Sequence, residues 1–155
     1  MTTFDRIRQW LTDRGAEYAE LHHEPTPTSE DAARARGEPV RIGGKALVMK
    51  VDDAFAVFVL SAALRADSRK IRRRFAARKA RFATPEELER LTGLVPGSVP
   101  PFGEPILPFR LCIDTSIPAN DRIAFNAGSL TDSIIMRTDD YLRIAGGEVF
   151  DFSQE

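Results

Sequence analysis

The chain has 155 residues, of which 43% are hydrophobic and 29% are charged, with a net charge of −1 and one cysteine. This composition is typical of a globular protein: no apolar run approaches the roughly 20 residues that cross a bilayer, and the N-terminus lacks a signal-peptide pattern. A single cysteine excludes an internal disulfide and multi-cysteine zinc sites, so we expect no metal. The length predicts one domain over residues 1–155, and without a signal peptide or an apolar span we expect it in the cytoplasm with no membrane contact.

The first half of the chain combines short helices with a hairpin. Apolar residues at helical spacing predict a first helix, which Thr3 caps and Gly15 ends. A second helix starts at the cap-like segment 28–31, after two prolines that break the preceding strand. Two apolar runs around Asp52-Asp53 predict a mostly buried β-hairpin. The helices are expected at residues 3–14 and 28–37, and the strands at 18–23, 45–51 and 55–61.

The second half begins with a strongly basic helix. Nine basic residues and one acidic residue fall between positions 65 and 82, on a helix that Asp67 or Ser68 can cap. One face of this helix carries its apolar residues, which are Leu64, Ile71 and Phe75. The positive charges can then occupy the other face, and so uneven a charge distribution indicates an anionic partner there.

Beyond this helix, a stiff loop and short strands follow. Thr84-Pro-Glu-Glu is a strong helix start, and that helix ends at Gly93. Residues 93–103 hold three glycines and three prolines, which predicts an irregular but packed loop with these residues buried: Leu94, Val95, Val99 and Phe102. Further strands are expected at residues 81–83, 109–114, 122–126, 133–137 and 149–152, with a last helix at 138–144. This order predicts an α+β domain with a mixed or antiparallel sheet flanked by helices.

Four segments could carry chemistry on residue type alone. Lys45 opens a buried strand after two glycines, where it either points into a pocket or is an ordinary solvated lysine. The loop from Gly97 to Pro101 either holds backbone groups around a substrate or forms a rigid turn. Small residues at 126–129 either admit a ligand close to the backbone or form a tight turn. The basic helix either contacts nucleic-acid phosphates or is a solvated surface.

Several established catalytic patterns are absent. The sequence has no phosphate-binding loop, no His-Glu-x-x-His zinc motif, no Gly-x-Ser-x-Gly elbow and no dinucleotide fingerprint. Its two histidines, His22 and His23, are neighbours, and on a strand they point to opposite faces. This spacing disfavours a histidine-rich metal site.

Four motifs occur in an order that resembles a known family. They are Gly44-Lys-Ala-Leu-Val-Met-Lys50, the loop at 93–103, Ile123-Ala-Phe-Asn-Ala-Gly-Ser129 and Asp140-Tyr-Leu-Arg-Ile-Ala145. Over residues 4–150 the chain resembles the YbaK/ProX family of aminoacyl-tRNA editing domains, and most of all its freestanding YeaK-type deacylases. The resemblance implies a mixed, barrel-like sheet flanked by helices. It also implies hydrolysis, in trans, of the ester that joins a wrong amino acid to tRNA.

The resemblance further implies residue roles, with no metal or organic cofactor. Lys45 matches the family lysine, which binds the anionic or oxygen-rich end of the substrate. Gly97 and Pro101 match the ends of the family's Gly-x-x-x-Pro loop, whose backbone holds the ester and a water. The implied substrate-binding residues are His23, Ser98, Val99, Pro100, Asn126, Ala127 and Gly128. Ala46 and Asp132 depart from the pattern of some branches, so the choice of amino acid does not transfer.

The implied partner is mischarged tRNA that carries a small amino acid such as Ser, Ala or Thr. The basic helix would contact its phosphates through Arg69, Lys70, Arg72, Arg73 and Arg74. One domain of this size can act as a monomer, and a transient synthetase partner stays open. Two other functions also stay open, namely a noncatalytic tRNA-binding or regulatory module on the same fold, and a small-molecule esterase or amidase.

Overall fold

The computed structural model describes all 155 residues as five α-helices, one 3₁₀ helix and ten short strands. The helices are α1 (Thr3–Asp13), α2 (Ser29–Arg36), η1 (Val40–Ile42), α3 (Ser68–Phe75), α4 (Pro85–Thr92) and α5 (Thr138–Ala145). The strands are β1 (Tyr18–His22), β2 (Gly44–Val51), β3 (Ala54–Ser61), β4 (Arg65–Ala66), β5 (Ala80–Phe82), β6 (Arg110–Asp114), β7 (Arg122–Asn126), β8 (Asp132–Arg137), β9 (Glu148–Phe150) and β10 (Ser153–Gln154). No helix combines the length and the apolar character needed to span a membrane.

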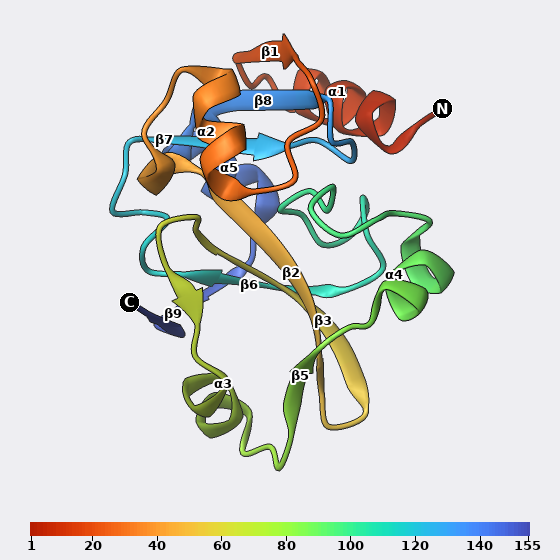
Figure 1. Ribbon diagram of the computed structural model, residues 1–155, viewed down its shortest axis with the longest axis vertical. Coiled ribbons are helices and arrows are strands. Elements are labelled where there is room, and N and C mark those ends of the chain that lie inside the picture. Colours follow the sequence, from red (N-terminus) through yellow and green to blue (C-terminus); the bar gives the residue numbers. More distant parts are fainter.

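The strands form three sheets, of which the largest is mixed. Its order is β5-β2-β3-β6-β9, with β2 antiparallel to both β5 and β3, and with β3, β6 and β9 parallel. The antiparallel sheet β1-β8-β7 lies with α1, α2 and α5 in the upper part of Figure 1, whereas α3 and β5 lie at the bottom. β4 and β10 form a two-stranded ribbon. The expected α+β class is confirmed, although the sheets remain separate and do not close into a barrel.

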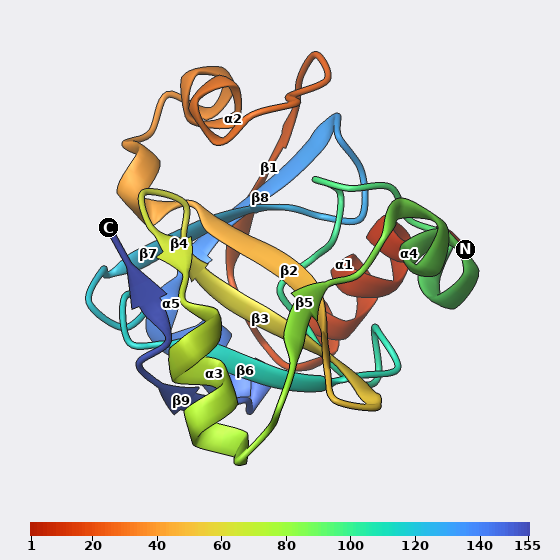
Figure 2. The same cartoon turned by 60° about the horizontal axis from the view of Figure 1, so that its bottom comes forward.

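The apolar core lies on both faces of the five-stranded sheet. Along β3, Val57 and Val59 join a larger cluster with α1 and α5, while Phe58 and Leu60 join a smaller cluster with α3. Figure 2 shows α1 and α3 on opposite sides of β3, and the α3 residue Ile71 is fully buried. Burial on both faces explains why the hairpin sequence reads as a continuous apolar run.

Capping residues set the helix boundaries close to the predicted ones. The cap of α1 is Thr2 and not the expected Thr3: the Thr2 hydroxyl accepts from the Asp5 N–H, and the Asp5 carboxylate accepts from the Thr2 N–H, each at 3.0 Å. Thr84 and Glu87 form the same reciprocal pair at the start of α4. These bonds satisfy N–H groups that the first helical turn leaves without partners.

The loop of residues 93–103, called here the proline loop, is irregular as expected and lies against the larger cluster. Leu94, Val99 and Phe102 are buried as expected, and so are Pro100 and Pro101. The prediction that Val95 is buried is wrong, since its side chain is 51% exposed. The reason is a turn in which the Ser98 N–H and hydroxyl both donate to the Val95 carbonyl, which leaves the valine side chain outside. The Tyr141 hydroxyl of α5 donates to the Pro101 carbonyl at 2.6 Å and ties the loop to that helix.

Candidate active site

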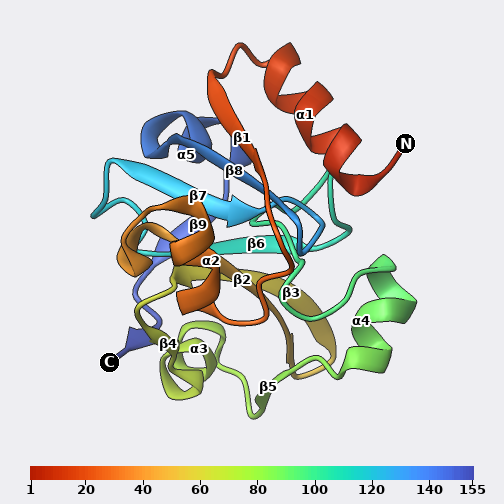
Figure 3. The ribbon, with the colours of Figure 1, turned by 45° about the horizontal axis from the view of Figure 1, so that its top comes forward.

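A pocket of about 200 Å³ lies where α2, the start of β2, the proline loop and the end of β7 meet. The chain runs from α2 through η1 directly into β2 at this point (Figure 3). Four residues predicted for the site line the pocket, namely Lys45, Gly97, Val99 and Asn126. The only other charged residue in the lining is Arg36, and no lining residue is acidic. The pocket therefore presents two cations and no carboxylate.

One wall of the pocket is an unpaired edge of β2. β5 pairs only with Met49–Val51, so the first part of β2 has no neighbouring β5 residue on that side. Backbone groups alternate in direction along a strand: the Gly43 carbonyl bonds on the β3 side, and the Val48 carbonyl bonds on the opposite side. The N–H and C=O of Ala46 consequently point away from β3 and toward the pocket that Ala46 lines. They offer a substrate one donor and one acceptor.

Lys45 enters the pocket as an unneutralised cation. The residue is half-buried, and its ammonium forms no hydrogen bond or ion pair with the protein. Burial lowers the pKa of Lys45 below its ordinary value; nearby Glu30 opposes this shift, and the positive charge of Arg65 adds to it. An ammonium in reduced dielectric that forms no ion pair favours an anionic or oxygen-rich ligand.

The proline loop contributes backbone donors to the pocket. Gly97 has a φ of +88°, in the left-handed region that favours glycine. The N–H groups of Gly97 and Val99 form no hydrogen bond within the protein, and both residues line the pocket. Fixed donors of this kind stabilise negative charge that develops on a substrate oxygen.

Asn126 connects this loop to two residues that the sequence did not identify. Its Nδ2 donates to the Gly97 carbonyl at 2.8 Å, and its Oδ1 accepts from Arg36 at 3.0 Å, which fixes the orientation of the amide. Ser133, which is fully buried, accepts from Arg36 Nε at 3.0 Å and donates to Asn126 Oδ1 at 3.2 Å. In the sequence, Arg36 looks no different from Arg34, a solvated arginine on the same helix.

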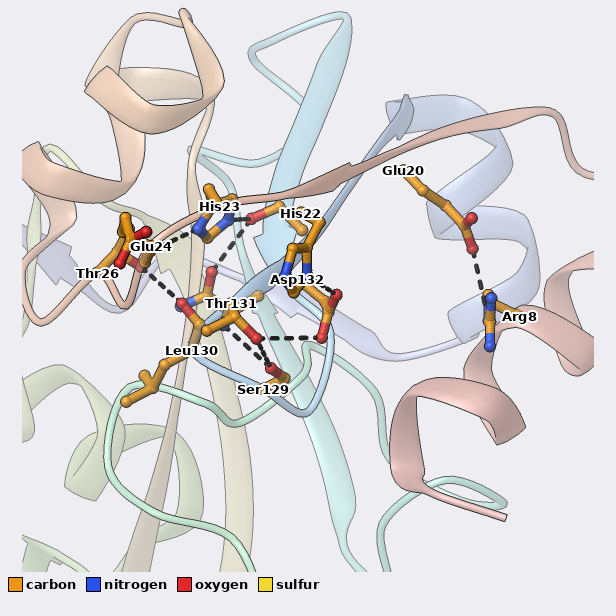
Figure 4. Close-up of polar contacts among 12 residues, drawn as sticks. Arg8, Glu20, His22, His23, Glu24, Thr26, Ser129, Leu130, Thr131 and Asp132 are labelled. Carbon is orange, nitrogen blue, oxygen red and sulfur yellow. Dashed lines mark hydrogen bonds and ion pairs between the residues drawn. The ribbon is translucent and has the colours of Figure 1, made fainter.

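The two histidines turn to different partners, as Figure 4 shows. His22 Nδ1 lies 2.9 Å from Asp132 Oδ1 at the surface. Partial burial raises the pKa of Asp132, but hydrogen bonds from His22 and neighbouring hydroxyls outweigh it and leave that pKa below its ordinary value. His23 lies 2.7 Å from Ser133 Oγ and 2.8 Å from the Glu24 carbonyl. His23 does not line the pocket, but it contacts Ser133, which bonds the lining residues Arg36 and Asn126; its role in substrate binding stays a prediction.

Three other loop residues also lie outside the pocket lining. Ser98 is 2% exposed, and its hydroxyl donates to the Val95 carbonyl at 2.7 Å, so this side chain closes the turn. The carbonyl of Pro100 accepts from Phe102 at 2.9 Å, and that of Pro101 accepts from Tyr141. The N–H groups of Gly97 and Val99 therefore remain as unbonded donors of this loop, and the hold of the loop on the ester and the water stays a prediction.

The small residues after Asn126 pack against the larger cluster and α1. Ala127 is fully buried in the larger cluster, and its N–H donates to the Asp132 carbonyl at 2.9 Å. Gly128 has a φ of +81° and lies against α1, where an added Cβ would come within 2.7 Å of Thr3. Neither residue lines the pocket, because the chain turns toward α1 directly after β7.

Acidic residues from distant segments neutralise part of the basic helix α3. Arg69 pairs with the capping Asp67, and Lys70 and Arg74 pair with the distant Asp151 and Glu148. Arg72 and Arg73 form no ion pair, and neither do Arg78 and Lys79 just after the helix. The free positive charge is therefore concentrated at Arg72, Arg73 and the following turn. None of the predicted tRNA-binding residues lines the pocket.

The pocket can bind and polarise a substrate without a protein nucleophile. Cys112 is buried away from it, and no group of three or more His, Cys, Asp or Glu side chains could hold a metal ion. The two cations, the free N–H groups of the loop and the open edge of β2 all address substrate oxygens. This arrangement suits hydrolysis of an activated ester by water.

Comparison with known proteins identifies the family. The family model for the aminoacyl-tRNA editing domain matches residues 23–144. The multifunctional Ser/Thr-tRNA deacylase ProXp-y of Escherichia coli strain K12 is 36% identical over 156 aligned residues, which cover 97% of this chain and 92% of that protein.

Solved structures agree with this assignment. A structure described as that of a candidate trans-editing enzyme for prolyl-tRNA synthetase has a TM-score of 0.84 and 27% identity, and the match covers 100% of this chain and 99% of that one. The structure of a hypothetical protein, at 22% identity and a TM-score of 0.86, covers 96% of this chain and 99% of its own, and shows the fold alone. The family expected from the four sequence motifs is confirmed, and the chain belongs to the aminoacyl-tRNA editing domain family.

Proposed function

We propose that this protein is a trans-editing deacylase that hydrolyses the ester of mischarged tRNA carrying a small amino acid, with Ser and Thr as the first candidates. The observation that carries the proposal is one pocket lined both by Lys45, which forms no ion pair, and by Gly97 and Val99, whose N–H groups have no partner in the protein. One relative, at 36% identity and with a match that covers 97% of this chain, is named as a Ser/Thr-tRNA deacylase.

In the proposed reaction, a water oxygen adds to the ester carbonyl carbon, and the bond from that carbon to the ribose oxygen then breaks. The amino acid leaves as its carboxylic acid, and the tRNA regains its terminal hydroxyl. The N–H groups of Gly97 and Val99 hold the carbonyl oxygen as it gains negative charge. Lys45 binds the oxygen-rich terminal nucleotide, and a neighbouring ribose hydroxyl of the substrate orients the water, since the pocket contains no histidine or carboxylate.

The tRNA body lies along the unpaired cations of α3 and the turn that follows it. Arg72, Arg73, Arg78 and Lys79 contact its phosphates, whereas Lys70 and Arg74 remain with their own carboxylates. The protein acts as a cytoplasmic monomer on released tRNA, and a transient contact with a synthetase stays a prediction.

The decisive experiment is hydrolysis of a panel of purified mischarged aminoacyl-tRNAs by the wild type and by Lys45→Ala. We expect the wild type to cleave seryl- and threonyl-tRNA and Lys45→Ala to lose this activity while its thermal unfolding stays close to that of the wild type. Lys70→Ala is the matched control, because Lys70 lies outside the pocket and Asp151 already neutralises its ammonium. Full activity in Lys45→Ala would overturn the assigned role. A folded wild type that binds tRNA but cleaves none would favour the noncatalytic module.

The contact with tRNA is tested by the salt dependence of binding. Each phosphate contact that is lost should reduce the slope of log K against log salt by about one unit. We expect the double variant Arg72→Ala/Arg73→Ala to reduce this slope by about one to two units. The control Lys70→Ala/Arg74→Ala, whose cations are already neutralised, should leave the slope unchanged. The reverse pattern would show that tRNA approaches from the other face of α3.

A further inference from the structure

Arg36 is a partly buried cation in the wall of the pocket. It is the last residue of α2, and its guanidinium reaches across to β7 and β8. Burial lowers the pKa of Arg36 to about 10, so the group remains protonated at neutral pH. Arg36 therefore adds a full positive charge to the pocket.

No carboxylate neutralises this charge. The two hydrogen bonds of the guanidinium go to neutral oxygens, Ser133 Oγ and Asn126 Oδ1, each at 3.0 Å. Arg34 on the same helix gives the contrast: its side chain is 76% exposed, and it pairs with Asp31 at 2.6 Å. The more buried arginine of α2 is thus the one without a counter-charge, although a buried cation is costly when it is left unpaired.

The unused donors of Arg36 are available to a ligand. A guanidinium has five N–H donors in a fixed fork, and two of them are engaged by Ser133 and Asn126. Three remain, on a side chain that lines the pocket together with Lys45. Because no lining residue is acidic, a bound molecule that carries a negatively charged oxygen can supply the missing counter-charge.

We propose that Arg36 is a substrate-binding residue that donates its free N–H groups to a negatively charged oxygen of the aminoacyl-tRNA. Two oxygens of the substrate have this chemistry, namely the carbonyl oxygen of the ester as it becomes an oxyanion, and the phosphate of the terminal nucleotide. This inference rests on the proposed deacylase function and adds a second cation to its binding site. The neutral bonds to Asn126 and Ser133 hold the fork in place for that contact.

Three substitutions separate charge from hydrogen bonding. Arg36→Met removes both, Arg36→Gln keeps a polar group that can bond Asn126 or Ser133, and Arg36→Lys keeps the charge without the fork. We expect kcat/KM for seryl-tRNA to fall by about 100-fold or more in the Met and Gln variants, and by less in the Lys variant. Arg34→Met is the matched control and should keep wild-type activity, because Arg34 is exposed and outside the pocket.

A second substrate identifies which oxygen is bound. On 3′-O-seryl-adenosine, which lacks a phosphate, the loss in Arg36→Gln should persist if the guanidinium binds the ester oxygen, and should vanish if it binds the phosphate. Either result supports an anionic ligand. Wild-type activity of a folded Arg36→Gln would overturn the inference, because neutral hydrogen bonding would then suffice. Equal losses in the Lys, Gln and Met variants would also overturn it. If the wild type cleaves no aminoacyl-tRNA at all, the proposed function itself fails, which distinguishes the two outcomes.

Discussion

Replacing Tyr141 with phenylalanine tests how α5 holds the proline loop. The change removes only the hydroxyl that donates to the Pro101 carbonyl at 2.6 Å, and the ring keeps its packing against Phe102 and Phe125. A net hydrogen bond contributes about 1 kcal/mol, and leaving a buried carbonyl without a donor costs about 1–3 kcal/mol. Because Tyr141 is completely buried, water cannot replace the lost donor, and we expect a loss of about 2 kcal/mol in the free energy of unfolding. For a domain of this size, that corresponds to about 4–8 °C in Tm.

Urea unfolding followed by the fluorescence of Trp10 measures this loss, because Trp10 packs edge-on against Phe102 at 5.3 Å between ring centroids. Tyr18→Phe is the control: the Tyr18 hydroxyl has only an exposed contact with Thr12 at 3.5 Å, and its removal should change stability by less than about 0.5 kcal/mol. Equal midpoints for the two variants would refute the reasoning. Deacylation should fall as well, by up to about 100-fold, because a displaced loop misaligns the N–H donors of the pocket.

Two further predictions concern ionisation. A hydrogen bond from Arg81, and then those from Thr84, lower the pKa of Glu87 from 4.5 to about 2. A depressed folded pKa adds stability that is complete above the unfolded pKa and is lost as the pH falls toward 2, so Glu87→Gln should flatten the decrease in Tm between about pH 5 and pH 2. An equally steep decrease would contradict this. Burial, with a smaller effect from Glu148, raises the pKa of Cys112 to about 12, so a thiol-reactive dye near pH 8 should label the native protein only at its opening rate. Immediate labelling of the folded protein would show that this thiol is accessible.

Local patterns in the sequence were enough to predict the main elements. The hairpin of β2 and β3 follows from two apolar runs around a turn, and α4 follows from a cap with its reciprocal glutamate. The ribbon of β4 and β10 could not be predicted, since strands of two residues leave no periodicity to read. The buried place of Ser98 and the exposure of Val95 depend on one turn within the proline loop, which composition does not specify.

Sequence reasoning proposed the site residues that have a local sequence signal and missed those whose place depends on contacts between distant segments. Lys45 can be recognised from the two glycines before it and the apolar strand after it, and Gly97 from the glycines and prolines of its loop. Arg36 matters only because Ser133, 97 positions away, comes to lie beside it. In the same way, the acidic partners of Lys70 and Arg74 lie 81 and 74 positions away, so a count of local charges overestimated the number of unpaired cations on α3.

The antiparallel pairing of β1 with β8 has a consequence for synthesis of the chain. His23 meets Ser133 across 110 positions, and the pocket wall cannot form until both segments have left the ribosome. At about 5–20 residues per second, Ser133, which lies 97 positions after Arg36, emerges about 5–20 s later. The basic helix is complete much earlier, since α3 ends at Phe75. A nascent chain therefore exposes the basic helix for several seconds before its candidate active site is complete. Slow long-range strand pairing extends that interval.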